Sequence, residues 1–129
     1  DLRMSRGLGD VYKRQDLEAE PWPYAEEAFD AIIVTNYLYR AHFPHYWRSL
    51  KSGGLFLMET FTTVNTAIWG RPRSPEHVLQ PGELLRLASP EARICAYEEG
   101  LNADELGLER IVWLKPGDAE VLALRLGAR

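Results

Sequence analysis

The sequence is poor in cysteine and has no long apolar run. Its single cysteine, Cys95, excludes an internal disulfide framework and is typical of a reducing compartment. Because Cys95 stands in an expected strand, we expect it in the core. No run approaches the roughly 18 apolar residues that a transmembrane helix needs, and no signal-peptide pattern is visible. These absences favour a cytoplasmic protein with no membrane partner.

An excess of basic residues is also missing. The net charge of −4 at pH 7 leaves no electrostatic footprint for a nucleic-acid partner. Metal-ligand spacing is missing as well, because no cysteine or carboxylate accompanies His42, His45 and His77 at suitable intervals; we therefore expect no metal site. The 129 residues, 46% hydrophobic and 26% charged, fit at most one globular domain with a core of its own.

The first fifteen residues lack hydrophobic periodicity. Gly7–Asp10 mimics a glycine-rich nucleotide loop, but no buried strand precedes it, as such a loop requires. Ser5–Gln15 resembles instead the in-frame translation of a transposon adapter used to prepare sequencing libraries. We therefore expect residues 1–15 to be a non-native, disordered leader, with a native disordered tail as the alternative. Without the four basic and two acidic residues of this leader, the net charge becomes −6.

An apolar run followed by a polar tip organises the rest of the chain. The run Ala31–Val34 is unbroken, which predicts a strand buried on both faces of a parallel sheet covered by helices. Thr35, Asn36 and Tyr37 follow it directly. Ligands in open α/β sheets bind beyond the carboxyl ends of the strands. This polar tip is therefore the first candidate site.

The segments that follow predict a right-handed βαβ unit. A crossover helix is expected over 38–52, with Gly53 ending it, and a second apolar strand over 54–60. The stretch 61–80 lacks a clear period and is long enough to predict a lid or a binding loop. The remaining expectations are a short helix over 81–88, strands over 93–99 and 109–114, and a terminal strand over 119–126 whose composition also suits a helix.

Three groups of residues resemble class I S-adenosylmethionine-dependent methyltransferases. The first is Asp16-Leu-Glu, Pro21-Trp-Pro-Tyr24 and Phe29-Asp30 leading to Val34-Thr-Asn-Tyr-Leu38. The second, Leu50–Phe56, is similar to the family's passage from a helix into its fifth strand, written L-x-x-G-G. The third, Gly70–Pro72 with Leu79–Leu85, resembles a bacterial subgroup with a substrate loop before a short helix.

The resemblance implies an α/β fold, a partial Rossmann-like methyltransferase sheet. The chain would supply the fourth to seventh strands, parallel with an antiparallel C-terminal pair, and residues 16–129 would be the C-terminal portion of a single methyltransferase domain. The family's glycine-rich loop after its first strand and the acidic residue ending its second strand are absent. We therefore expect an enzyme whose parent protein transfers methyl from S-adenosyl-L-methionine to a small-molecule acceptor, and a fragment that is inactive alone.

The resemblance also implies cofactor-binding residues. Asp16 would accept a hydrogen bond from the adenine amino group, and Leu17 would contact the adenine. Thr35, Asn36 and Tyr37 would position the methionine part of the cofactor and the methyl acceptor. The alternatives are a solvated loop acid for Asp16 and strand-end or helix-cap chemistry for Thr35 and Asn36.

Four further residues are candidates for the substrate. Arg40 and Arg71 could bind an anionic substrate, His42 could act as a general base, and Glu59 could face the pocket from the end of its strand. Each could equally be a solvated or paired surface group. No catalytic residue is identified, because methyl transfer from an activated sulfonium needs mainly positioning. Two rival functions remain, a nicotinamide-dependent oxidoreductase of the Rossmann type and a nonenzymatic α/β binding module.

Overall fold

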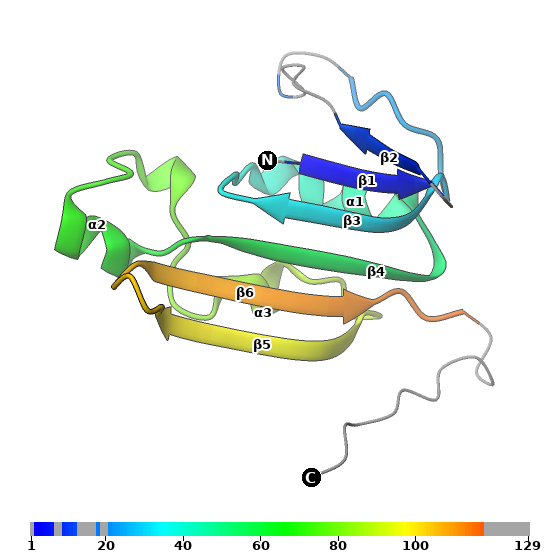
Figure 1. Cartoon of the computed structure of the whole chain (residues 1–129). Coiled ribbons are helices and arrows are strands. Elements are labelled where there is room, and N and C mark those ends of the chain that lie inside the picture. The colour runs from blue at the N-terminus through cyan, green and yellow to red at the C-terminus, as the bar shows by residue number, and fades with distance from the viewer. Residues whose placement is uncertain (1, 7–8, 13–17, 19–20, 118–129) are drawn as a thin grey trace, which may run out of the picture.

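The computed structural model describes residues 2–6, 9–12, 18 and 21–117. In this part of the chain six strands form one sheet in the order β2-β1-β3-β4-β6-β5 (Figure 1). The strands are β1 (Leu2–Arg6), β2 (Gly9–Tyr12), β3 (Phe29–Thr35), β4 (Leu50–Phe61), β5 (Arg93–Leu101) and β6 (Gly107–Leu114). The helices are α1 (Phe43–Ser49), α2 (Thr63–Trp69) and α3 (Glu83–Leu87), with 3-10 turns η1 (Arg40–His42) and η2 (Pro75–His77). None of these helices has the length and apolarity to cross a membrane.

The predicted βαβ unit is confirmed, with a shorter helix. β3 and β4 pair in parallel, with Ile32 opposite Phe56 and Val34 opposite Met58, and η1 and α1 connect them. The helix ends before Leu50, whose backbone is already extended at φ −86° and ψ 134° and begins β4. Gly53 therefore lies within β4 and does not end the helix, although it takes the expected left-handed φ of 82°.

The C-terminal strands confirm the predicted fold class. β6 runs antiparallel to β4 on one side and to β5 on the other, so the last two strands form an antiparallel pair. β3, β4, β6 and β5 together make a partial Rossmann-like sheet. The strands expected over 93–99 and 109–114 are present with slightly wider bounds. The strand expected over 119–126 lies outside the described residues.

The N-terminal segment adds two strands at the edge of the sheet. β1 pairs antiparallel with β3, and β2 pairs antiparallel with β1. Residues 2–6 and 9–12 therefore form a hairpin where the sequence predicts disorder. The non-native origin of residues 1–15 and the division of the chain at Asp16 stay predictions.

The core lies on one face of the sheet, which α1 and α3 cover from behind in Figure 1. The rings of Phe56 and Trp113 stack with their centroids 4.5 Å apart, and Tyr46 of α1 lies 5.2 Å from Phe56. The side chains of Phe56, Trp113 and Tyr46 are all fully buried. The members of the core are Phe29, Ile32, Val34, Leu38, Phe43, Tyr46, Leu50, Phe56, Met58, Leu79, Leu84, Ile111 and Trp113.

Two burial predictions are wrong. The sequence predicts burial of the run Ala31–Val34 on both faces of the sheet. The run is buried on one face only, because Ile33 is exposed on the side opposite the helices. Cys95 is exposed and not a core residue. It stands at a register shift in β5, the outermost strand, where the alternation between the two faces of the sheet is interrupted.

Two polar side chains, Glu109 in β6 and Lys115 directly after it, attach α3 and α1 to this strand. The Lys115 ammonium donates hydrogen bonds of 2.8 Å to the carbonyls of Trp47 and Leu50 at the C-terminus of α1. A cation there satisfies carbonyls that the helix leaves unpaired. At α3, the buried carboxylate of Glu109 accepts hydrogen bonds from the Leu84 N–H and the Tyr97 hydroxyl, both at 2.9 Å. The pKa of Glu109 is raised, because the effect of burial outweighs the lowering by these two hydrogen bonds.

We expect Lys115→Met to destabilise the chain by about 1–2 kcal/mol, because two partly buried carbonyls at the end of α1 lose their donor. Urea unfolding at pH 7 measures this change. Lys51→Met is the matched control, because Lys51 forms only an exposed pair with Asp30 at 3.5 Å. Equal destabilisation by the two substitutions would contradict the capping role of Lys115.

Candidate functional site

The candidate site begins where β3 ends. Asn36 follows the strand with a left-handed φ of 53°, a conformation that asparagine tolerates better than most residues. Its backbone N–H donates to the Glu59 carbonyl at 3.0 Å, so the ladder to β4 continues one residue past the strand. The Asn36 side chain is exposed, whereas Thr35 and Tyr37 are half-buried. The turn at Asn36 thus fixes the direction in which Tyr37 leaves the sheet.

Two adjoining cavities lie at this edge, and we call them the strand-tip cavities. The first, about 260 Å³, is lined by Asn36 and Tyr37 after β3, by Thr60 in β4 and by residues of the segment that follows α2. The second, about 280 Å³, is lined by residues 38–41 and by Glu76. Both cavities share Glu18, Leu38 and His77. Their combined size fits a small organic ligand.

Polar and apolar groups alternate around the first cavity. The Tyr37 hydroxyl donates to a carboxylate oxygen of Glu18 at 3.0 Å. Leu38 is buried and forms an apolar wall, while the Thr60 side chain is buried at the end of β4. The cavity therefore combines an aromatic ring, a carboxylate and an amide beside an apolar wall.

The predicted loop over 61–80 contains a helix that the sequence did not indicate. α2 was missed because its large apolar residues Val64, Ile68 and Trp69 are exposed and follow no core-facing period. Side chains of α2 hold the segment behind it: the Asn65 amide donates to the Arg71 carbonyl at 2.8 Å, and the Thr66 hydroxyl donates to the Pro72 carbonyl at 2.7 Å.

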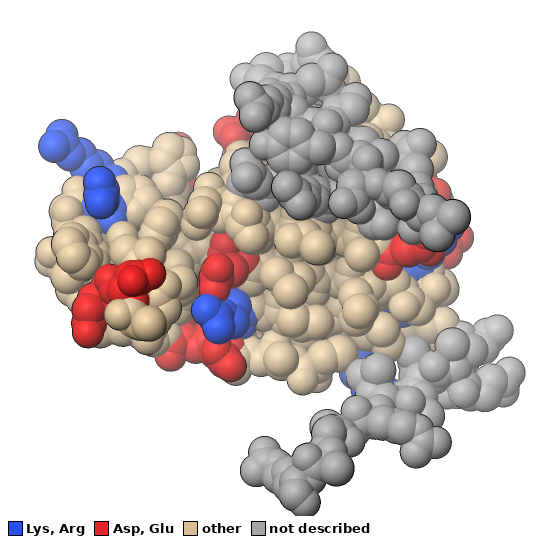
Figure 2. Space-filling view, in the orientation of Figure 1, with Lys and Arg blue, Asp and Glu red and all other residues tan. Residues whose placement is uncertain are grey.

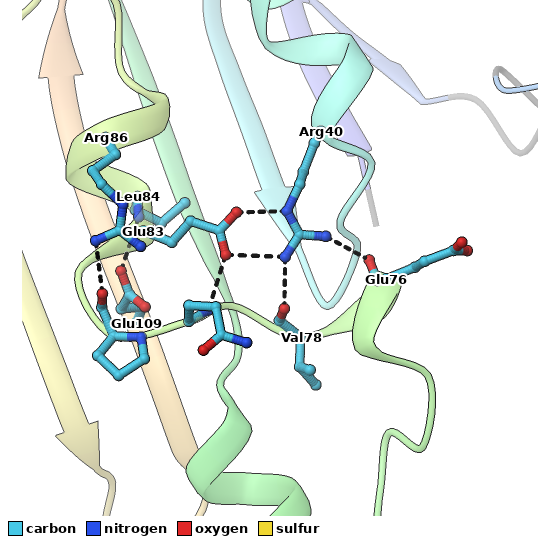
Figure 3. Close-up of polar contacts among 9 residues, drawn as sticks. Arg40, Glu76, Val78, Glu83, Leu84, Arg86 and Glu109 are labelled. Carbon is cyan, nitrogen blue, oxygen red and sulfur yellow. Dashed lines mark hydrogen bonds and ion pairs between the residues drawn. The ribbon is translucent and has the colours of Figure 1, made fainter.

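Arg40 joins the strand tip to the segment beside the cavities (Figure 3). Its guanidinium donates through Nε to Glu83 Oε2 at 2.5 Å and through Nη2 to Glu83 Oε1 at 2.9 Å. It also donates to the carbonyls of Val78 at 2.8 Å and Glu76 at 3.2 Å. The hydrogen bond between Arg40 and Glu83 raises the pKa of Arg40 and lowers the pKa of Glu83. We call this arrangement the Arg40 clamp.

The clamp changes what Arg40 can do in the site. Arg40 lines the second cavity, but its charge is balanced by Glu83 and most of its donors are occupied. Binding an anionic substrate would require breaking a bidentate ion pair. Glu83, which accepts the Gln80 N–H at 2.9 Å, was not predicted as part of the site. The available signal was its position in the first turn of the short helix.

His42 does not line either cavity. It is buried among aromatic rings, with centroids 4.5 Å from Tyr39 and 5.1 Å from Trp22. Burial, with a smaller effect from His45, lowers the pKa of His42 to about 4. A neutral imidazole with so low a pKa is a weak general base. The geometry therefore places His42 in the packing behind the site.

The other predicted site residues divide between the cavities and other places. Glu59 lies on the opposite face of β4 from the core and pairs with Arg110, Nε to Oε1 being 2.9 Å. Arg71 is exposed, next to Pro72, which lines the first cavity. Asp16 and Leu17 lie outside the described residues. The structure thus brings Asn36, Tyr37 and Arg40 to the cavities, with Thr35 directly before them in β3. The His42 ring lies 6.1 Å from the Tyr37 ring but lines neither cavity, and the Glu59 side chain points to the opposite face.

Comparison with known proteins supports the fold and no more. No protein-family model matches the sequence, and no curated protein matches it. The solved structure of the [4+2]-cyclase SpnF is similar, with a TM-score of 0.56 and 16% identity over 73% of this chain and 52% of that chain. A structure described as "Conversion of a Disulfide Bond into a Thioacetal Group during Echinomycin Biosynthesis" is similar with a TM-score of 0.54 and 15% identity, and it covers the same shares of both chains. This chain therefore spans about half the length of these structures and shares with them a methyltransferase-like fold.

We expect a double-mutant cycle of Arg40→Met and Glu83→Gln to give a coupling energy of about 1–2 kcal/mol, because the pair is bidentate and Glu83 is largely buried. Urea unfolding of the four proteins measures it. The cycle of Arg110→Met and Glu98→Gln is the control, since both members of that pair are exposed and should couple by less than about 0.5 kcal/mol. Equal coupling in the two cycles would contradict the Arg40 clamp.

The low pKa of His42 predicts a loss of stability in acid. The folded state binds this proton only near pH 4, whereas the unfolded chain binds it near 6.5, so stability falls as pH drops from 6.5 towards 4. We expect His42→Phe to remove about 2–3 kcal/mol of this pH dependence. Unfolding curves at several pH values between 4 and 7 measure the difference, and parallel profiles for both proteins would refute it.

Proposed function

We propose that the parent protein transfers a methyl group from S-adenosyl-L-methionine to a small-molecule acceptor. This chain would supply the wall of the active site formed by the fourth and fifth strands. The observation that carries the proposal is the pair of strand-tip cavities at the carboxyl ends of β3 and β4, the parallel strands of a partial methyltransferase sheet. Open α/β sheets bind their ligands at this edge.

The residues of the strand tip fit one side of such a cofactor. The exposed Asn36 amide and the Tyr37–Glu18 pair offer donors and acceptors to the amino-acid part of the ligand. By resemblance, Asp16 and Leu17 would meet the adenine, and Thr35 would lie beside the methionine part. When bound, the cofactor would supply a methyl group that its sulfonium has already activated. The chain's own residues would then orient the two ligands and exclude water.

In this proposal, the segment 70–80 would form the wall that binds the methyl acceptor. The Arg40 clamp holds it against the strand tip, Asn65 and Thr66 attach it to α2, and it contributes Pro72 and His77 to the cavities. Glu83 balances the charge of Arg40. The wall would therefore recognise the acceptor by its shape and by hydrogen bonds more than by an ion pair with an anionic group of the acceptor.

Titration with S-adenosylhomocysteine tests this proposal. We expect the 129-residue chain to bind weakly or not at all, because it lacks a glycine-rich loop. A parent protein restored by its genomic reading frame should bind, and Asn36→Gly or Tyr37→Phe should weaken binding about tenfold by removing one hydrogen-bonding group each. Asn36→Gly keeps the left-handed backbone, so it isolates the amide. Glu91→Gln, at an exposed position outside the strand-tip cavities, is the control.

Two results would contradict the proposal. Micromolar binding by the 129-residue chain alone would show that the site is already complete. An upstream sequence without a strand followed by Glu or Asp-x-Gly-x-Gly would remove the expected cofactor loop. In that case another Rossmann-type enzyme would be the better assignment, because one fold hosts many reactions.

A further inference from the structure

Three large apolar side chains of α2 lie open to solvent. Val64, Ile68 and Trp69 are 47%, 49% and 48% exposed. Val64 and Ile68 are four residues apart, so they share one face of the helix, and Trp69 ends the helix beside Ile68. The buried residue of α2 is the polar Asn65, whose side-chain oxygen accepts the Gly107 N–H at 2.9 Å. We call Val64, Ile68 and Trp69 the α2 patch.

The α2 patch reverses the usual polarity of a surface helix. Such a helix turns its apolar stripe to the core and its charged residues to solvent. α2, with the sequence TVNTAIW, has no charged residue and exposes most of its apolar ones. Single exposed apolar residues are common on protein surfaces, whereas a cluster of large ones marks an interaction site. The patch therefore indicates a surface that binds another molecule.

An acidic turn borders the α2 patch on one side. The Trp69 indole N–H donates to the Glu105 carbonyl at 2.9 Å, which places the turn between β5 and β6 against the end of α2. Asp104 and Glu105 are both exposed in this turn. Within the described residues neither carboxylate forms an ion pair. We call these two residues the acidic turn.

A basic segment borders the patch on the other side. Gly70 ends α2 with a left-handed φ of 72°, and the chain then turns back, so that the Thr66 hydroxyl reaches the Pro72 carbonyl at 2.7 Å. Arg71 and Arg73, the basic segment, are exposed, and in the part of the chain that the structure describes neither forms an ion pair. In Figure 2, at the end of the molecule where Figure 1 labels α2, blue and red groups lie on opposite sides of an uncharged area.

The charges on the two sides of the α2 patch are complementary to each other. A two-fold axis that runs along the patch exchanges its two sides, so a second copy of the chain presents its acidic turn to the basic segment of the first copy, and the reverse. The apolar side chains of the two copies then meet between these charged contacts. An apolar centre with a polar rim is the usual composition of a protein interface.

We propose that the α2 patch binds a second copy of this chain in a symmetric dimer, with the basic segment of each copy against the acidic turn of the other. A second copy is the favoured occupant because this chain itself carries the charges that a partner needs. Arg71 lines neither strand-tip cavity, and the dimer gives it a contact. Because the segment 70–80 also lines these cavities, the second copy would support that segment from outside. The proposal concerns assembly and does not rest on methyl transfer.

Sedimentation equilibrium of the 129-residue chain, from about 5 to 500 µM, tests the proposal. We expect a monomer–dimer equilibrium in this range. Ile68→Lys should raise the dissociation constant of the dimer at least about tenfold, because an ammonium would be buried without a partner. The urea midpoint of its monomer should shift by less than about 0.3 M, since position 68 is exposed in the single chain. Ile94→Lys is the matched control, because Ile94 is 42% exposed at the start of β5, and it should leave the dimer unchanged.

Charge reversal tests the orientation of the two copies. The variant Arg71→Glu with Arg73→Glu should stay monomeric, because each copy would bring carboxylates against the acidic turn of the other. The variant Asp104→Lys with Glu105→Lys should stay monomeric for the corresponding reason. An equimolar mixture of these two variants should form a mixed dimer, because both charged contacts are then restored with reversed sign.

Four outcomes would overturn the proposal. The first is a chain that stays monomeric at the highest concentration, and the second is a dimer that Ile68→Lys leaves intact. The third is a mixture of the two charge-reversed variants that does not associate. The fourth is loss of the dimer in the control variant Glu26→Lys with Glu91→Lys, two exposed sites away from α2, because net charge and not the α2 patch would then govern association.

Discussion

The parallel pairing of β3 with β4 is the constraint on which the rest of the structure depends. It aligns the carboxyl ends of both strands at one edge of the sheet, and the connection between them places α1 against the face that carries the core. β6 then completes the core by stacking Trp113 on Phe56. The Asn36 N–H extends the ladder to the Glu59 carbonyl. Backbone hydrogen bonds of the sheet therefore fix the position of the strand tip.

The wall beside the strand tip has a different origin, because a short β-bridge between Thr62 and Leu79 and side chains that bind backbone carbonyls hold it in place. Arg40 binds the carbonyls of Val78 and Glu76, and Asn65 and Thr66 bind those of residues 71 and 72. Such contacts satisfy a segment that has little secondary structure of its own. The site thus consists of a rigid tip and a wall attached to it by a few long-range hydrogen bonds.

The sequence predicted those features that depend on local pattern. The apolar runs located β3 and β4, and the end of β3 located Asn36 and Tyr37. The pairing of Arg40 with Glu83 joins residues 43 positions apart, which no local pattern reveals. α2 was missed because its apolar residues are exposed, and Cys95 was misplaced because β5 shifts register there. The apolar run in β3 predicted burial on both faces, but Ile33 is exposed, because a run of residue types does not show which faces of a strand other elements cover.

The central proposal is that the tip of β3 forms one wall of a site for S-adenosyl-L-methionine. Amide chemical shifts of the parent protein, titrated with S-adenosylhomocysteine, test it most directly. We predict that the largest changes fall on residues 35–38 at the tip of β3, with little change along β5 and β6 away from that edge. Binding that leaves residues 35–38 unperturbed, or that perturbs mainly β5, would contradict the account.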